Sequence, residues 1–170
     1  CVGKLLGLHR CMKGGIGNAS VRVGPWVVGA LVACNAVGDV IDPSTGHILA
    51  GARTADGRQL ANTQRAFLNG ERGNRPLPGT NTTIGVIATN GTLTKAQAKR
   101  LAMSAHDGLA RSIRPAHTTL DGDTLFAMAT GTETSPADLM LLTMMAAEAT
   151  ALATVDAIRQ AHAIETLAGH

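Results

Sequence analysis

The sequence predicts an α+β protein in which helices cover a sheet. Four apolar stretches have the length of buried strands, and two long segments show helical spacing behind N-terminal caps. Along the 170 residues the order is hairpin, strand, helix, strand, helix. This order suits a layered α+β fold. Because no internal repeat is present, we treat residues 1–170 as a single domain.

The first predicted element is a β-hairpin. Residues 14–18, GGIGN, are interpreted as a tight glycine turn that needs positive φ, because the glycines lead into a strand and not into a nucleotide-binding helix. The alternation in ASVRVG predicts a strand, and Pro25 ends it. Residues 26–35 form a second, almost wholly apolar strand, so we expect a hairpin that is buried on at least one face.

Residues 42–80 are interpreted as an excursion from the sheet. They are rich in Gly, Pro, Arg, Asn and Thr and lack sustained periodicity, apart from a short helix expected around residues 60–69. The excursion ends in RPLPGTN, where Pro76 and Pro78 indicate an exposed linker.

Strand and helix then alternate to the end of the chain. A third strand is expected at residues 82–89, and Thr94 with Gln97 forms a capping box for the next helix. The apolar stripe of this helix comprises Ala98, Leu101, Ala102, Ala105, Leu109 and Ile113.

A fourth strand is expected at residues 124–130. Ser135 is the predicted cap of the last helix, with Pro136 at its first position, and the helix is expected to run to about residue 165. Ala, Leu and Met residues occur on most sides of this helix, so we expect the helix to be buried against other elements or subunits.

Composition argues against several classes of protein. The net charge is only +3 and aromatic residues make up 2%, so nucleic acid is not an expected partner. Three cysteines without CxxC spacing indicate neither a disulfide scaffold nor a structural zinc site. The chain has no uninterrupted apolar run of about 20 residues and no leader pattern, so we expect no membrane partner and a cytoplasmic location. Because it opens on Cys1 with core-like residues, we expect it to be incomplete at the N-terminus.

Two carboxylates one residue apart are the first candidates for chemistry. Asp121 and Asp123 flank Gly122 just before the fourth strand, and alternate residues of an extended segment point the same way. The alternative interpretation is a turn with two solvated acids. His106, Asp107 and His117 lie near them in sequence, but their spacing matches no familiar ligand pattern, so no metal site is predicted.

Three further residues could assist a reaction. Lys4 and Lys13 flank glycines near the start of the chain, and a buried lysine can act as a donor or a tuned base. Asn35 ends an apolar strand, where its amide could either cap the strand or donate to an oxyanion.

The stretch NTTIGVIATN at residues 81–90 suggests how a nucleophile could arise. Thr82 begins a strand behind a proline-bearing linker. Cleavage of the Asn81–Thr82 bond would free an α-amine with a pKa of about 8, which can take the proton of the threonine hydroxyl. The spacing therefore permits this mechanism.

Several motifs together resemble one enzyme family. The stretches are KGGIGNAS, VVGALVACNAVGDVIDP, NTTIGVIATNGTLTKAQAKRLAMSAHDGLARSIRPAHT and LDGDTLFAMATG. They resemble the L-aminopeptidase/D-esterase DmpA family of N-terminal-nucleophile hydrolases, and the DGD form with an Asn-Thr junction is most similar to its nylon-oligomer (6-aminohexanoate-oligomer) endohydrolase branch. The resemblance implies an αββα sandwich like that of ornithine acetyltransferase, of which this chain would be the C-terminal portion.

The resemblance also implies the site and the processing. Self-cleavage at Asn81–Thr82 would separate residues 1–81, the end of an α-subunit, from residues 82–170, a β-subunit. Thr82 would be the nucleophile, with Asp121 and Asp123 to orient it, Asn35 as oxyanion donor and Lys4 as a further active-site residue; Lys13 is the alternative to Lys4.

The implied activity is hydrolysis of amide bonds in peptides or nylon-type oligomers through an acyl-enzyme, without a cofactor. The implied partners are the missing N-terminal segment of the same precursor and further copies, as a tetramer of processed αβ units. The alternatives are an acyltransferase of the ornithine acetyltransferase type, a non-catalytic oligomeric subunit and a metalloenzyme.

Overall fold

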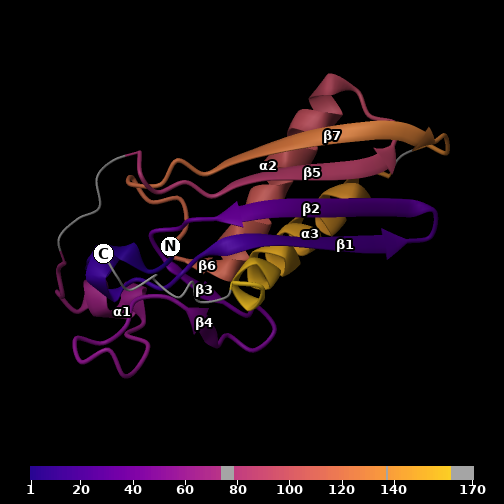
Figure 1. The fold of residues 1–170 in the computed structure, drawn as a ribbon. Coiled ribbons are helices and arrows are strands. Elements are labelled where there is room, and N and C mark those ends of the chain that lie inside the picture. Colours follow the sequence, from indigo (N-terminus) through magenta and orange to yellow (C-terminus); the bar gives the residue numbers. More distant parts are fainter. Residues whose placement is uncertain (74–78, 137, 162–170) are drawn as a thin grey trace, which may run out of the picture.

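A computed structural model of the chain describes residues 1–73, 79–136 and 138–161. Two short 3₁₀ helices, η1 and η2, precede a series of strands and helices (Figure 1). The elements are η1 (Lys4–Leu6), η2 (Leu8–Arg10), β1 (Gly15–Val23), β2 (Trp26–Cys34), β3 (Asp39–Ile41), β4 (Ile48–Ala50), α1 (Thr63–Leu68), β5 (Ile84–Gly91), α2 (Lys95–Ser112), β6 (Ile113–Arg114), β7 (Thr124–Glu133) and α3 (Leu139–Arg159).

The main sheet has the strand order β1-β2-β5-β7. β1 and β2 form the predicted antiparallel hairpin, and β2 pairs antiparallel with β5. β5 and β7 are parallel neighbours, with α2 in the connection between them. Parallel neighbours begin at the same edge of a sheet, so the residues before β5 and before β7 lie together. A second, small sheet has the order β4-β3-β6.

Helices α2 and α3 cover one face of the main sheet (Figure 1). Leu101, Leu109 and Leu142 are fully buried in the core that this face forms with the helices. Long apolar helices with such a face are stabilised mainly by this burial. The α+β prediction is therefore confirmed. Of the four layers of an αββα sandwich, the described residues form one main sheet and the helix layer that covers it.

Helix α3 is long and apolar enough to cross a membrane by length and composition alone. Helices in the core of a packed domain meet the same test. Here α3 packs against α2, β1 and β2, and more than half of its apolar window is buried in the fold. The packing of α3 in the core therefore accounts for its apolar composition.

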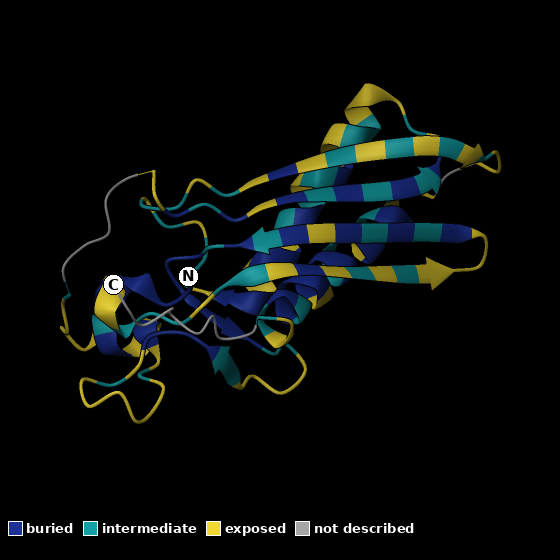
Figure 2. Cartoon of the chain, in the orientation of Figure 1, coloured by how far each residue is buried: buried dark blue, intermediate teal, exposed yellow. Residues whose placement is uncertain are grey.

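The opposite face of the main sheet is apolar and open (Figure 2). One row across the strands places Val86 between Leu31 and Phe126. The large apolar side chains of this face are between 46% and 65% exposed: Ile16, Leu31, Ile84, Phe126 and Met128. A contiguous exposed apolar patch of this kind is uncommon on monomeric soluble proteins and marks an interaction surface.

The glycine stretch before the hairpin differs from the prediction. Gly15 and Gly17 lie inside β1 and do not have positive φ. A Cβ built on Gly17 would lie 2.1 Å from the Ala157 backbone nitrogen and 2.2 Å from the Ala153 carbonyl oxygen. These glycines are needed because α3 crosses β1 in backbone contact, and not because the chain turns.

The ends of α3 also differ from the prediction. The N-cap is Asp138, which accepts a hydrogen bond from the Leu141 backbone N–H at 3.1 Å, and not Ser135. An aspartate side chain is as good a cap as serine, and Ser135 instead donates its backbone N–H to Glu133 Oε1 at 2.8 Å. The helix ends at Arg159 with Gln160 as C-cap, short of residue 165. Pro76 and Pro78 of the predicted linker lie outside the described residues.

The other predicted elements are present. The capping box of Thr94 and Gln97 is formed at α2, and the short helix expected around residues 60–69 is α1. The short strands β3, β4 and β6 were not predicted, because two or three residues are too few to show a period of two.

Candidate active site

The residues that precede β5 and β7 form a short continuation of the parallel ladder. Asn81 bridges Asp121, which extends the register in which Ile84 faces Thr124. The Gly122 N–H donates to the Asn81 carbonyl oxygen at 2.8 Å. The peptide bond predicted to be cleaved therefore has its carbonyl oxygen already bound to a backbone donor.

Thr82 is half-buried, and its side chain faces Gly122. A Cβ built on Gly122 would be only 2.8 Å from Thr82 Oγ1. Side chains alternate along an extended segment, so the Thr82 hydroxyl lies on the side opposite to the two aspartates. That side continues into the open face of the main sheet, where Ile84 is exposed.

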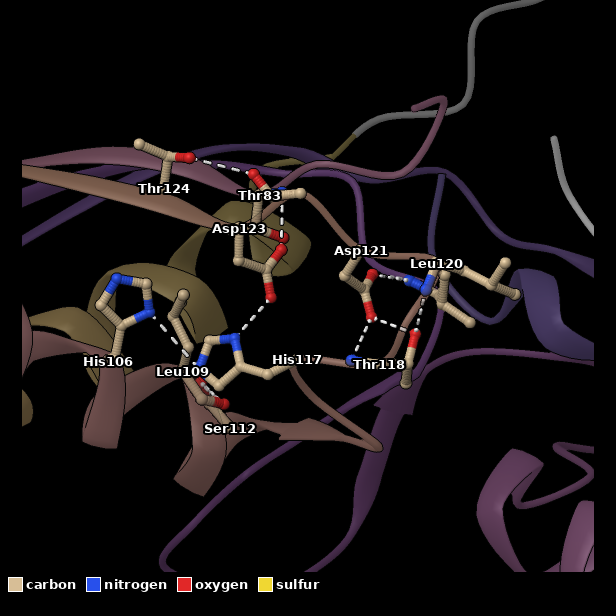
Figure 3. A network of polar contacts seen from close by, with 12 residues as sticks. Thr83, His106, Leu109, Ser112, His117, Thr118, Leu120, Asp121, Asp123 and Thr124 are labelled. Carbon is tan, nitrogen blue, oxygen red and sulfur yellow. Dashed lines mark hydrogen bonds and ion pairs between the residues drawn. The ribbon is translucent and has the colours of Figure 1, made fainter. Parts of the chain in front are cut away.

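Asp121 and Asp123 point together toward the helix-covered side (Figure 3). Asp123 Oδ1 accepts the Thr83 backbone N–H at 2.9 Å, and its side chain is 2% exposed. Asp121 Oδ1 accepts the Val37 N–H at 3.1 Å, which ties the segment before β7 to the segment after β2. Neither carboxylate is freely solvated, so the geometry favours the paired arrangement over two solvated acids in a turn.

The two carboxylates also have donors on one loop. His117 Nδ1 lies 3.0 Å from Asp123 Oδ2. The Thr118 backbone N–H and hydroxyl both donate to Asp121 Oδ2, at 3.0 and 2.7 Å. Each carboxylate is thus held on both of its oxygens.

Lys4 and Asn35 meet one residue before the predicted cleavage point. Lys4, only 3% exposed, donates to the Asn35 carbonyl oxygen and Oδ1, both at 2.9 Å, and to the Thr80 carbonyl oxygen at 3.3 Å. Asn35 Nδ2 donates to the same Thr80 oxygen at 3.0 Å. Of the two lysines considered from sequence, the structure brings Lys4 to this position, whereas Lys13 is exposed.

Burial lowers the pKa of Lys4 from its ordinary value, and the nearby Asp121 acts in the opposite direction. The amine is therefore more easily deprotonated than a solvated lysine and still has three oxygen acceptors. A cavity of about 250 Å³, lined by residues that include Lys4, Asn35 and Thr80, opens next to these donors. The two donors could receive a ligand's carbonyl oxygen there if Thr80 moved away.

The histidines considered for a metal site lie beside Asp123. His106 Nδ1 is 3.4 Å from His117 Nε2, and the His117 ring contacts the carboxylate. Within the described ranges, no group of three or more His, Cys, Asp or Glu side chains is arranged to hold a metal ion.

Sequence reasoning missed Thr118 and Thr83. Both belong to Thr-Thr pairs, at residues 118–119 and 82–83, so a hydroxyl residue three positions before Asp121 was the available signal for an aspartate-centred turn. Thr83 is buried, and so is Cys34, where burial raises the pKa of the thiol to about 11.

The model of peptidase family S58 matches residues 7–170 of the chain. An uncharacterized aminopeptidase of Mycobacterium leprae is 47% identical over 129 residues, which are 71% of this chain and 33% of that protein. The 6-aminohexanoate-oligomer endohydrolase of Paenarthrobacter ureafaciens is 35% identical over 120 residues, which are 68% of this chain and 33% of that protein. The chain therefore spans about a third of the length of the curated relatives it matches.

Two solved structures are similar to the fold. The Burkholderia sp. beta-aminopeptidase has a TM-score of 0.59 at 29% identity, over 86% of this chain and 42% of that one. The L-aminopeptidase D-Ala-esterase/amidase of Ochrobactrum anthropi has a TM-score of 0.55 at 23% identity, over 87% and 40%. The latter is described as a new variant among the Ntn hydrolase fold, which this chain shares over the matched part.

Proposed function

The chain belongs to peptidase family S58, and we propose that the protein is an N-terminal-nucleophile amide hydrolase that cuts itself between Asn81 and Thr82. The observation that carries this proposal is the hydrogen bond of 2.8 Å from the Gly122 N–H to the Asn81 carbonyl oxygen, beside the Thr82 hydroxyl. A donor on this oxygen polarises the bond that must break. The relatives named as aminopeptidase and 6-aminohexanoate-oligomer endohydrolase support amide bonds as the target.

Self-cleavage would begin with attack of Thr82 Oγ1 on the Asn81 carbonyl carbon. The oxyanion forms on the oxygen that Gly122 already contacts. The C–N bond then breaks, the Thr82 nitrogen takes the hydroxyl proton, and Asn81 becomes an ester on Oγ1. Water cleaves the ester, which leaves an Asn81 carboxylate and a free Thr82 amine that can serve as base in later turnovers.

Turnover of a substrate would use the same hydroxyl and the donors next to it. Departure of the Thr80–Asn81 segment would release Lys4 Nζ and Asn35 Nδ2 from the Thr80 carbonyl oxygen. We assign them to the carbonyl oxygen of the substrate amide. The acyl group moves to Thr82 Oγ1, the amine product leaves with a proton, and water releases the acid.

The open face of the main sheet supports a partner in the complete protein. Its exposed apolar side chains lie on the same side as the Thr82 hydroxyl. We assign this face to a further segment of the precursor, in keeping with the greater length of the relatives. The substrate cleft would then lie between the two layers.

Intact mass and N-terminal sequencing of the full-length protein test the proposal. Wild type should yield a fragment that starts at Thr82, Thr82→Ser should yield the equivalent fragment, and Thr82→Ala should stay intact. The serine variant is the matched control because it keeps the hydroxyl. Cleavage that survives in Thr82→Ala would contradict the mechanism, as would an uncut wild-type protein that still hydrolyses peptides or 6-aminohexanoate oligomers.

A further inference from the structure

Two consecutive residues of the loop between β6 and β7 each hold one carboxylate. His117 contacts Asp123 Oδ2 at 3.0 Å, and Thr118 donates twice to Asp121 Oδ2 (Figure 3). The loop thus faces both acids from the side opposite to Gly122 and Thr82. Family resemblance gave neither residue a role.

The His117 contact has a defined direction. An ionised carboxylate can only accept, so the proton of this hydrogen bond is on His117 Nδ1. The other oxygen of Asp123 accepts the Thr83 N–H at 2.9 Å, one residue after Thr82. A continuous path of hydrogen bonds therefore runs from His117 through Asp123 to the backbone of the nucleophile segment.

His117 is itself held in an uncommon conformation. Its φ is 52°, in the left-handed region that few residues other than glycine, asparagine, aspartate and histidine adopt. Behind it, His106 Nδ1 on α2 lies 3.4 Å from His117 Nε2. Burial, and then the proximity of His117, lower the pKa of His106, while Asp123 and Asp107 act in the opposite direction. A neutral His106 can donate to or accept from Nε2, so it supports His117 in either form.

From these contacts we propose that His117 and Thr118 are positioning residues for self-cleavage and amide hydrolysis. Each orients one carboxylate: His117 through Nδ1–H on Asp123, and Thr118 through its N–H and hydroxyl on Asp121. Loss of the His117 donor would leave Asp123 Oδ2 buried without that partner, and it would loosen the carboxylate that accepts the Thr83 N–H. The inference rests on the proposed function, since it concerns the two carboxylates that flank Gly122 beside the Asn81–Thr82 bond.

A matched pair of substitutions at residue 117 isolates the donor. Asparagine can place an N–H near the position of Nδ1 and tolerates positive φ; aspartate has the same shape and tolerance but presents a negatively charged oxygen to Asp123. In the full-length protein, His117→Asn should keep most of the self-cleavage rate. His117→Asp should lower that rate and kcat by roughly 10- to 100-fold, the range expected for one hydrogen bond to a charged group, with KM little changed.

Thr118 provides a second pair in case His117→Asp does not fold. Thr118→Ser keeps the hydroxyl on Asp121, whereas Thr118→Val removes it and keeps the shape and the backbone N–H. The valine variant should cleave itself more slowly than the serine variant, with the melting temperatures of both compared first. Equal rates in this pair would refute the role of the Thr118 hydroxyl.

The outcomes separate this inference from the proposed function. Equal rates for folded His117→Asn and His117→Asp, in a protein whose wild type cleaves itself, overturn the inference and leave the proposed function standing. A wild type that neither cleaves itself nor hydrolyses amides removes both. Loss of rate in the aspartate variant alone supports both.

Discussion

Replacing Gly122 by alanine should misplace the nucleophile while leaving the backbone donor in position. The new Cβ would lie 2.8 Å from Thr82 Oγ1, whereas ordinary contacts begin at 3.4 Å, so the hydroxyl must retreat by about 0.6 Å. The Gly122 N–H can still bind the Asn81 carbonyl oxygen, because alanine retains it. A shift of this size should slow self-cleavage by roughly 10- to 100-fold, since misplacement of about 1 Å can cost about 100-fold.

The assay is the time course of self-cleavage, followed by intact mass after expression of the full-length protein. Gly29→Ala is the matched control: Gly29 lies in β2 of the main sheet, and its Cβ would meet only the Ala19 carbonyl oxygen, at 3.8 Å. Thermal unfolding of both variants establishes that they are folded. If folded Gly122→Ala cleaves itself as fast as Gly29→Ala, Thr82 Oγ1 is not the attacking group in the position described, and the reasoning fails.

Three other predictions concern stability and reactivity. Burial lowers the folded-state pKa of Lys4 below 10.5, so between the two pKa values the folded protein binds fewer protons than the unfolded chain. The free energy of unfolding should therefore rise with pH from the lowered pKa to 10.5. Urea titrations should show that Lys4→Met flattens this rise. Because its pKa is raised to about 11, the buried Cys34 thiol should resist iodoacetamide at a pH of about 8 and should react only after unfolding. The exposed Cys1 should react in the folded protein. Early labelling of Cys34 in a peptide map would contradict its burial. Leu142 is fully buried, so Leu142→Ala should lower the free energy of unfolding by about 2–5 kcal/mol. Leu68 is 77% exposed, so Leu68→Ala should lower it by less than about 0.5 kcal/mol. Equal denaturant midpoints for the two variants would refute this packing.

The long elements could be predicted because their patterns are local. The apolar alternation of β2, the capping box of Thr94 and the apolar stripe around Leu101 depend only on neighbours a few residues away. The same locality explains the errors. The glycines of β1 are required by α3, which lies more than a hundred residues later in the chain, and no local pattern carries that information.

The candidate site divides in the same way. The sequence alone determined that Asp121 and Asp123 share one side of an extended segment and that Gly122 takes the other, since alternation is a property of the backbone. It also predicted that a hydroxyl residue follows Asn81 at the entrance of a strand, and β5 begins two residues later, at Ile84.

Only the tertiary structure decided what these residues meet. The parallel pairing of β5 with β7 places Gly122 against the Asn81–Thr82 bond, although some 40 residues separate them in the chain. The loop after β6 brings His117 and Thr118 onto the carboxylates, and η1 carries Lys4 to Asn35. Hydrogen bonds between distant segments depend on how the strands and helices are packed in space, and a pattern of neighbouring residues does not specify that packing.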